Sequence, residues 1–464
     1  MAKANAKTAL AVDLMNSAIS TLAETTRGFD FPDVTAESWG SWVDGLINSR
    51  YENQFYQQLV DTIYQNIVSK AIYENSLREF KAGSVNNGAG VRETFIDKID
   101  AMPYATTSVE RKELKTYLAD IYESRYLVNM QRDYPVTLGR VQFRGYVSSP
   151  ERVIDLIDTI KSMLFTSNEM DEYGLMKTLI QAYILSGKAY IVPVDMTDGL
   201  TDFAVQYRKM SFKLAGVPTR KYNEYGVMNN TPKDRQVLFL PSEVAARFQV
   251  TELSSSFNID YVNWNTAVKV LEDIDEPYSE LPKLRAINPS IPNIDAAASA
   301  ALATVVGVLM DREFFKVYDV INEMWDKERG SMMDVNYFLH LMQIFATSPF
   351  ANIVVFVSGE ATEQPATLTV NVVSKSANAN YTDYVLEVKH TANSLVGGAL
   401  NFTQTEEAAE AGIMVTKTGF VRLPASAASG VTLTGEIRGT VYTATAALTL
   451  SSNVGDTLTF NKSE

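Results

Sequence analysis

Hydrophobic and polar positions repeat with different periods along the chain, and each period predicts a type of element. Apolar residues recur every three or four positions from Leu10 to Leu22 and from Trp39 to Ile47, as on one face of a helix. The second stripe, which includes Trp42, predicts a helix that docks either on its own core or on a neighbouring copy of the chain. The helical spacing continues from Phe55 to Tyr73.

An extended pattern follows these helices. Residues 75–83 and 91–100 have strand-like patterns, and the Gly- and Asn-rich segment Gly83–Gly90 separates them, which predicts a β-hairpin with its tip at Gly83–Gly90. No Gly-Lys-Ser/Thr follows the glycines, so a phosphate-binding loop is not predicted. The charged stretch from Val109 to Arg125 predicts a polar helix.

The best-marked helix start in the chain is Ser148-Ser149-Pro150-Glu151, with a hydroxyl cap, proline at the first position and an acid in the first turn. A second helix is predicted from Met170 to Ser186, ended by a glycine. Glu169, Asp171 and Glu172 stand at its start, where the helix macrodipole favours acids. We therefore expect a solvated cap there, and not a metal or acid–base cluster.

The middle of the chain predicts both strands and helices. Phe203, Val205 and Tyr207 alternate in the manner of a strand, and Gln236–Leu240 predicts a buried strand that a helix follows. The acidic run Leu271–Glu276 lacks the spacing of a calcium-binding loop, and it precedes several prolines. We expect an exposed loop there.

The longest apolar runs lie between Thr304 and Glu360. Val305–Met310 and Ile353–Val357 are almost continuously apolar, as in strands that are covered on both faces, and aromatic-rich segments lie between them. We expect three or four buried strands in succession. After Gly359, Thr, Val, Ala, Ser and Asn dominate, and short alternating runs predict a small β-sandwich.

Composition limits the chemistry of the chain. It has 464 residues, no cysteine and only two histidines, which excludes a thiolate metal site and disfavours a histidine metal centre or a Ser-His-Asp triad. The formal net charge of −14 argues against a protein that wraps nucleic acid on its own surface. We expect no membrane helix and no signal peptide, and a soluble protein made in a cytoplasm.

Several motifs in colinear order carry a family resemblance. The closing stretch contains Asp311-Arg312-Glu313-Phe314-Phe315-Lys316-Val317-Tyr318-Asp319, then Asn336-Tyr337-Phe338-Leu339-His340 and Ser348-Pro349-Phe350-Ala351-Asn352. An earlier string is Asp171-Glu172-Tyr173-Gly174-Leu175-Met176-Lys177. Together they resemble the major capsid proteins of tailed phages, in particular the phi-29-like small podophages. The string that begins at Gly412-Ile413-Met414 is similar to the bacterial immunoglobulin-like (group 2) domain.

The resemblance implies an α+β protein of the Hong Kong 97-type capsid fold followed by an all-β immunoglobulin-like sandwich. It implies an N-terminal arm (1–50), a capsid shell domain (51–359) and an immunoglobulin-like domain (360–464). Within the shell domain, it implies an extended loop at about 71–147 with a return leg through Val136–Val147, spine helices at about 149–187 and an axial domain at about 188–330.

The function that this resemblance implies is structural. Copies of the chain would form pentamers and hexamers of an icosahedral or prolate shell around double-stranded phage DNA. The partners would be scaffolding and portal proteins, with no cofactor, metal, membrane or sequence-specific DNA binding. The candidates for contact between subunits are Arg78, Lys81 and Arg92 on the predicted hairpin, and Trp39 and Trp42 on the arm. Ordinary solubilising charge is the alternative for the three basic residues.

Three other functions stay open at this stage. An encapsulin-like compartment would share the shell fold but enclose a cargo enzyme. A surface lattice or adhesin protein would explain the β-sandwich, although it would need a secretion signal. An enzyme would need a nucleophile with its base, or a carboxylate pair in a pocket, and no motif favours one. We therefore expect a virion protein without enzymatic activity, assembled in the host cytoplasm.

Overall fold

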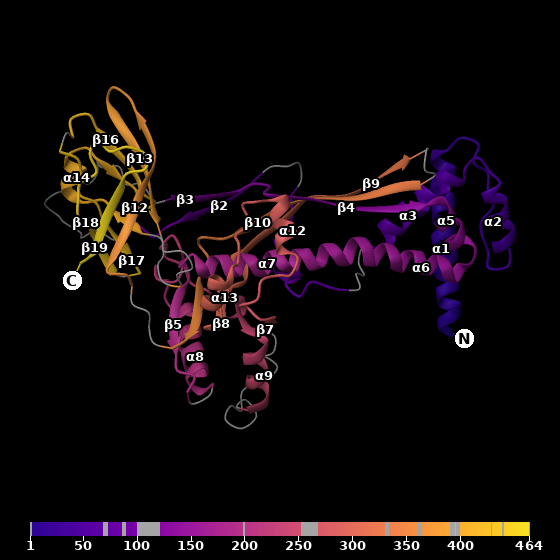
Figure 1. Ribbon diagram of the computed structural model, residues 1–464, viewed down its shortest axis with the longest axis horizontal. Coiled ribbons are helices and arrows are strands. Elements are labelled where there is room, and N and C mark those ends of the chain that lie inside the picture. The colour runs from indigo at the N-terminus through magenta and orange to yellow at the C-terminus, as the bar shows by residue number, and fades with distance from the viewer. Residues whose placement is uncertain are drawn as a thin grey trace, which may run out of the picture.

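The computed structural model describes residues 2–67, 73–85, 90–99, 121–197, 200–251, 268–329, 334–359, 364–389, 395, 400–427, 429–438 and 440–463. The chain is elongated, and its termini lie at opposite ends of the long axis (Figure 1). A helical cluster occupies the N-terminal end, three sheets lie in the middle, and an all-β part occupies the C-terminal end (Figure 1).

The N-terminal cluster consists of α1 (Ala2–Thr25), α2 (Trp39–Ile47), α3 (Glu52–Ile67) and α5 (Arg140–Val147). Its core buries both predicted tryptophans within the chain itself. The indole of Trp39 donates to the carbonyl of Val147 at 3.0 Å, and that of Trp42 donates to the carbonyl of Pro32 at 2.8 Å. Buried indoles with satisfied N–H groups are typical of a docked helix, so α2 packs on its own core.

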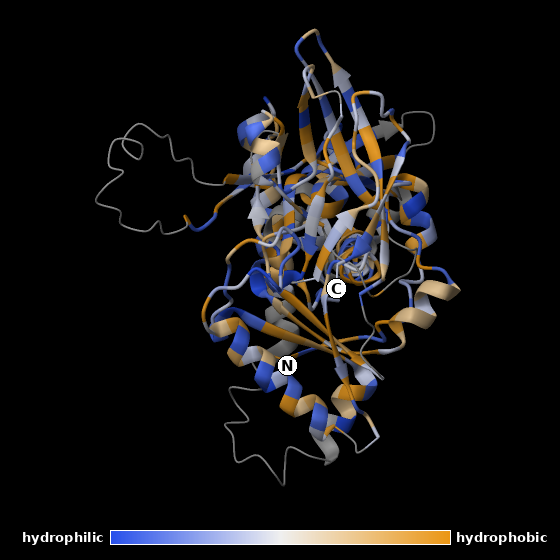
Figure 2. Ribbon diagram, turned by 90° about the vertical axis from the view of Figure 1, so that its left-hand side faces the viewer, coloured by the Kyte–Doolittle hydropathy of each residue, from blue (hydrophilic) through white to orange (hydrophobic). Residues whose placement is uncertain are grey.

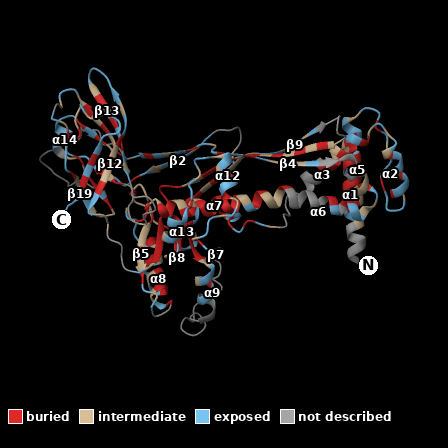
Figure 3. Cartoon of the chain, viewed as in Figure 1, coloured by how far each residue is buried: buried red, intermediate tan, exposed pale blue. Residues whose placement is uncertain are grey.

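One long helix connects this cluster to the middle of the molecule. It begins with α6 (Pro150–Ile160), continues through a π-helical segment (Lys161–Thr166) and ends with α7 (Ser167–Leu185). At 1.5 Å per residue it spans about 50 Å. The predicted start at Pro150 and the predicted glycine stop are both confirmed, since Gly187 follows the helix with φ +69°. Figure 3 shows buried residues concentrated along α7.

A four-stranded sheet runs alongside the long helix. Its order is β1 (Gly83–Ser84), β9 (Phe315–Arg329), β10 (Asp334–Thr347) and β4 (Met130–Gly139). β10 pairs antiparallel with both of its neighbours, whereas β1 pairs parallel with β9 at Tyr318 and Asp319. The inward residues of β10 join the N-terminal core at one end of the strand and the central core at the other.

A five-stranded sheet holds the centre. Its order is β5 (Tyr190–Val194), β11 (Ile353–Ser358), β8 (Val305–Asp311), β6 (Gln236–Pro241) and β7 (Val268–Leu271). Alternate residues of β8 and β11 belong to separate hydrophobic clusters, so both faces of the sheet are covered. This explains the continuous apolar runs. Four strands, β8 to β11, follow one another as predicted, but only β8 and β11 are buried along almost their whole length.

Helices cover both faces of this sheet: α8 (Thr201–Ala215), α9 (Ser242–Thr251), α12 (Leu281–Ile287) and α13 (Ala296–Leu302).

The predicted strand at Phe203–Tyr207 is wrong, because these residues form part of α8. Phe203, Tyr207, Met210 and Leu214 are buried on one face of that helix, and the helical period overlaps the alternation over a few residues. The return leg predicted over Val136–Val147 is also only partly correct. It is a strand as far as Gly139, and α5 begins at the next residue, Arg140.

The second strand of the predicted hairpin, at 91–100, pairs with a strand other than the predicted one at 75–83. β2 (Val91–Ile96) pairs antiparallel with β3 (Ile121–Tyr126), whereas Gly83–Ser84 pairs with β9. The predicted tip at Gly83–Gly90 is therefore wrong. Of the polar helix predicted over Val109–Arg125, residues 109–120 lie outside the described residues, and the remainder forms β3.

The C-terminal part is all-β apart from one short helix, α14 (Glu406–Glu410). Eight strands form one antiparallel sheet in the order β14 (Asn401–Thr403), β17 (Thr434–Ile437), β18 (Thr440–Ala444), β19 (Thr457–Lys462), β12 (Thr367–Ala377), β13 (Tyr381–Lys389), β16 (Phe420–Pro424) and β15 (Met414–Val415). The sheet encloses its own hydrophobic core. Figure 2, in which this end faces the viewer, shows hydrophobic and hydrophilic positions alternating along strands.

The structure confirms the predicted α+β class with an all-β C-terminal part. Because hydrogen bonds join all eight C-terminal strands in one continuous sheet, the immunoglobulin-like assignment stays a prediction. The pairing of β12 with β13 has a register shift between Val372 and Ser374, and an irregularity of this kind bends a strand.

The packing of α7 against Tyr278 generates a stability prediction. A Cβ at Gly174 would lie 2.3 Å from the Tyr278 ring, which cannot move freely because its hydroxyl donates to Asp171 at 2.9 Å. Gly174→Ala is expected to lower the free energy of unfolding by about 1–3 kcal/mol, measured by urea denaturation of the unassembled protein.

The matched control is Gly40→Ala in α2, where nothing except the adjacent residues and the helix's own backbone lies within 4 Å of the new Cβ. It should raise the free energy of unfolding by up to about 1 kcal/mol, because alanine favours the helix. Equal effects of the two substitutions would show that the close approach at Gly174 does not constrain the helix.

Candidate functional site

The first turns of α7 carry acidic side chains that are buried. Glu172 is only 1% exposed and Glu169 is 8% exposed. The predicted solvated cap is therefore wrong for these two residues. The sequence pattern shows a helix start but not which elements cover it. Here β10 and the segment 75–84 supply the partners of both carboxylates.

Lys81 is the centre of this buried network. Its Nζ lies 2.8 Å from Glu172 Oε2 and 2.8 Å from Asp319 Oδ2. The amide of Gln343 donates to the same two carboxylates, at 2.9 and 2.7 Å. Burial alone would lower the pKa of Lys81, but the two carboxylates outweigh burial and raise it. The network therefore joins the segment before the hairpin to α7, β9 and β10.

A second layer of polar contacts extends the network to β4. Arg132 donates to the side chain of Gln343 and, at 3.0 Å, to the hydroxyl of Tyr134. Tyr134 and Tyr278 in turn donate to Asp171 at 2.6 and 2.9 Å. Burial, together with the negative charge of Asp171, raises the pKa of both tyrosines, so they remain hydroxyl donors at physiological pH.

Arg78 attaches the same segment at a neighbouring position. It lies 3.2 Å from Glu169, whose other oxygen accepts from the backbone N–H of Asn75 at 3.1 Å. Burial raises the pKa of Glu169, although the Asn75 N–H and the charge of Arg78 oppose this effect. Arg78 and Lys81 are thus not on the hairpin, and both pair with α7 of their own subunit.

The inner face of the β2–β3 hairpin is fixed by Glu93. Its carboxylate accepts from the hydroxyls of Tyr126 at 2.5 Å and Ser348 at 2.9 Å, and it lies 3.0 Å from Nζ of Lys316. Strand alternation places Phe95 on the same face, where its ring stacks on Phe350 with the centroids 5.6 Å apart. The inner face is therefore docked on the subunit.

Asp97 fixes the end of β2. Its side chain is fully buried, and it accepts from the backbone N–H groups of Lys98 at 2.8 Å and Met228 at 3.2 Å. It also pairs with Arg220. Burial alone would raise the pKa of Asp97, but these two N–H groups and Arg220 lower it overall. A charged Asp97 therefore holds the hairpin at neutral pH.

The outer face of the hairpin is different. Arg92 and Arg125 stand directly opposite each other in the register, and Glu123 approaches them at 3.6 and 2.7 Å. One carboxylate cannot balance two guanidinium groups, so a positive charge remains. Beyond Thr94 and Glu123 on the same face, the cross-strand pair Ile96 and Ile121 is 66% and 63% exposed. This face has an apolar pair and surplus positive charge side by side.

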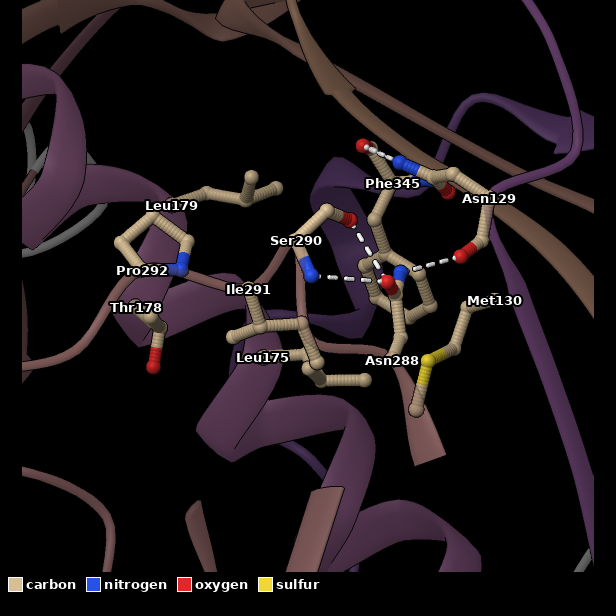
Figure 4. Close-up of a pocket in the computed structure, with 10 residues that line it drawn as sticks. All are labelled: Asn129, Met130, Leu175, Thr178, Leu179, Asn288, Ser290, Ile291, Pro292 and Phe345. Carbon is tan, nitrogen blue, oxygen red and sulfur yellow. Dashed lines mark hydrogen bonds between the residues drawn. The ribbon is translucent and has the colours of Figure 1, made fainter. Parts of the chain in front are cut away.

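A small pocket of about 140 Å³ lies beside α7 (Figure 4). It is lined by apolar side chains and uncharged polar ones: Asn129, Met130, Leu175, Thr178, Leu179, Asn288, Ser290, Ile291, Pro292 and Phe345. The side chain of Asn129 exchanges hydrogen bonds with the backbone of Phe345, and Asn288 donates to the carbonyl of Asn129 at 2.5 Å. The lining offers room for a small apolar group but no group that titrates near neutral pH.

Within the described ranges, no cluster of three or more Asp, Glu and His residues has a geometry that could hold a metal ion. No helix in the same part of the chain has both the length and the apolar character that crossing a bilayer requires.

Of the five predicted contact residues, only Arg92 lies on the hairpin. Trp39 and Trp42 are buried in the N-terminal core, and Arg78 and Lys81 are paired with the long helix. Sequence reasoning missed Glu93 and Asp97. Glu93 could have been found from its place between Val91 and Phe95 on the inward face of a strand, where an acid needs a partner.

Comparison with known proteins gives a family match. The model of the Phi29-like phage major capsid protein family matches residues 15–357. The major capsid protein of Bacillus phage GA-1 is 26% identical over 353 residues, which cover 74% of this chain and 69% of that protein. That of Bacillus phage B103 is 27% identical over 352 residues, which cover 73% and 72%.

Solved structures are also similar. The capsid structure of Staphylococcus phage Andhra aligns with 64% of this chain and 87% of its own, at 11% identity and a TM-score of 0.48. A chain from the structure of the head fiber and inner core protein gp22 of bacteriophage P68 covers 62% and 86%, at 13% identity and a TM-score of 0.49. The family match ends before the all-β part begins at β12.

The buried network predicts the effect of removing its lysine. Lys81→Met leaves the buried Glu172 and the partly buried Asp319 without their cation, so the free energy of unfolding should fall by about 3–5 kcal/mol in urea denaturation. Adding Glu172→Gln to this variant should restore part of the loss. As a control, Arg247→Ala breaks an exposed pair with Glu243 and should cost about 0.5 kcal/mol or less. A loss as small for Lys81→Met would contradict the network.

Asp97 predicts a pH dependence. Because folding lowers its pKa, its contribution to stability is present above the usual value of 3.8 and is lost as the pH falls through the lowered pKa. At pH 6, Asp97→Asn should lower the free energy of unfolding by about 1–3 kcal/mol. Below pH 3.8 the difference from the native protein should shrink toward zero. A difference that stays constant from pH 6 to pH 2.5 would show that Asp97 does not act through its charge.

Proposed function

The chain belongs to the Phi29-like phage major capsid protein family and is thus a structural subunit of a phage capsid, and we propose that its copies assemble through the β2–β3 hairpin. The product is a closed icosahedral or prolate shell of pentamers and hexamers around double-stranded DNA. One observation supports the choice of surface: the outer face of the hairpin pairs exposed isoleucines with surplus positive charge.

A neighbouring copy of the chain can supply negative charge and apolar contacts to this face. The chain has a net charge of −14, so an average surface of a second copy attracts a surplus guanidinium group. Ile96 and Ile121 would lose their exposure to water in the contact, which favours association by roughly 25 cal/mol per Å² of apolar surface. Each contact is weak, and repetition over a closed lattice makes the shell stable.

The candidate counter-surface is the far end of β9. Beyond Asp319, no strand in the described part of the chain pairs with the outer edge of β9. Glu323 and the exposed indole of Trp325 lie in this stretch. The hairpin and this end of β9 lie toward opposite ends of the long axis (Figure 1). A head-to-tail contact between two such surfaces can close into rings, as pentamers and hexamers require.

The rest of the functional proposal follows from the family. Scaffolding and portal proteins are the proposed partners, assembly takes place in the host cytoplasm, and the chain has a structural role without catalysis. The proposed division is an N-terminal arm (1–50), a shell domain (51–359) and a separate all-β domain (360–464). Arg92 is retained as a contact residue between subunits, whereas Arg78, Lys81, Trp39 and Trp42 stabilise the subunit that presents the contact.

The test is a double variant of the outer face, Ile96→Ser with Ile121→Ser. Both side chains are exposed, so the free energy of unfolding should change by about 0.5 kcal/mol or less, whereas the yield of shells in sucrose gradients should fall at least roughly tenfold. The control is Val454→Ser, an exposed apolar position in the all-β domain that should leave the yield unchanged.

Shells from the double variant at the native yield would show that the hairpin is not the contact. A native protein that stays monomeric under all assembly conditions, with scaffolding protein supplied, would contradict shell formation itself.

A further inference from the structure

Among the described residues, two cationic side chains of the all-β domain (360–464), Lys417 and Arg438, reach the rest of the subunit, and Lys417 contacts the hairpin. Leu395 of the same domain also packs against the central core. Nζ of Lys417 lies 3.7 Å from Oδ2 of Asp97 and 5.8 Å from the ring centroid of Tyr122. Asp97 follows β2 and Tyr122 belongs to β3. A single lysine of the all-β domain therefore touches both strands of the hairpin, at the end where Ile96 pairs with Ile121.

The same region of the domain also covers the loop that holds Asp97. Arg220 and Met228, which bind Asp97, flank Gly226, and the carbonyl of Gly226 accepts from Arg220 at 3.2 Å. The amide of Asn401 lies directly over Gly226, since a Cβ built there would be 2.5 Å from its Nδ2. The contact therefore includes the hairpin end and its anchoring loop.

The second place of contact is Arg438, in the tight turn between β17 and β18. Arg438 is the one non-glycine residue with positive φ (+53°) among the described residues. Its guanidinium donates to the carbonyl of Lys188 at 2.6 Å and lies 5.6 Å from the ring centroid of Tyr190. Asparagine or glycine adopts positive φ more easily than arginine does. The turn nevertheless has Arg438, whose side chain binds the backbone just beyond the end of α7.

Both contacts border a cleft of about 1190 Å³. The hairpin, the loop at 218–228 and the all-β domain all line it, and Lys417 and Arg438 are both among the lining residues. Two separated contacts restrict rotation of the domain where a single contact would act as a pivot. The domain is therefore held against the backbone between α7 and β5 and, at the same time, against a small two-stranded hairpin.

We propose that the all-β domain is a latch that holds the Ile96–Ile121 end of the hairpin in place on its own subunit and so orients the outer face for assembly. The orienting role rests on the proposed function, whereas the latch itself is a property of the single subunit. The hairpin is also docked through Glu93 and Phe95, so the latch acts on one end of it and leaves the other end as it is.

The latch is tested by hydrogen–deuterium exchange of the full-length, unassembled protein, with the variants Lys417→Ala, Arg438→Asn and both together. Asparagine tolerates positive φ, so Arg438→Asn keeps the turn and removes only the guanidinium. Lys462→Ala removes the same charge as Lys417→Ala from an exposed position in β19, and it serves as the matched control.

In the double variant, exchange should rise roughly five- to tenfold at residues 95–97 and 121–122 and less than about twofold at residues 91–92 and 125–126. Lys417→Ala alone should give the same gradient with a smaller rise, and Lys462→Ala should match the native protein. Exchange in β8 and β11 should not change, because they lie in the central core.

Unchanged exchange at the Ile96–Ile121 end would overturn the latch, and so would an equal rise along the whole hairpin or in β8 and β11. Should Arg438→Asn loosen the all-β domain itself, Lys417→Ala against Lys462→Ala still decides the question. Shell yield, measured separately, distinguishes the two proposals: a loosened hairpin with native shell yield supports the latch and contradicts its role in assembly.

Discussion

The architecture depends on the burial of one lysine between two carboxylates. Lys81, Glu172 and Asp319 come from three different parts of the chain, and each charge loses water in the fold, Glu172 almost completely and the other two in part, so each needs the others as partners. Their pairing sets the segment before the hairpin, the long helix and the four-stranded sheet in one relative position. The tyrosines on Asp171 extend this constraint to β4 and to the loop that contains Tyr278.

A second set of contacts fixes the position of the hairpin on this framework. Glu93 and Asp97 dock the inner face of the hairpin on the subunit, and the outer face is left with Arg92, Arg125, Ile96 and Ile121. The network on α7 thus fixes the long helix and the four-stranded sheet relative to each other. The hairpin docks on them with its outer face toward solvent, where a neighbouring copy can bind. The all-β domain contacts both ends of this arrangement, the segment that follows α7 through Arg438 and the hairpin through Lys417.

Local patterns predicted local structure well. The helix start at Pro150, its glycine stop and the buried strands of β8 and β11 follow from caps and from apolar runs, which depend on neighbouring residues alone. The partner of β2 could not be predicted, because residues 97–120 separate it from β3 and nothing in either strand specifies the other. In α8 the spacing of Phe203 and Tyr207 fitted a strand and a helix equally over a short window.

The candidate site was predicted only in part, because the environment of a charge is a property of the fold. Glu172 at a helix start fits a solvated cap, and only the sheet that packs on it shows that it is buried.

The most direct test of the central claim is a cryo-electron microscopy map of assembled particles. We expect the outer face of the hairpin, with Arg92 and the Ile96–Ile121 pair, to lie against another copy of the chain throughout the shell. A map in which this face is exposed to solvent at every position would contradict that claim.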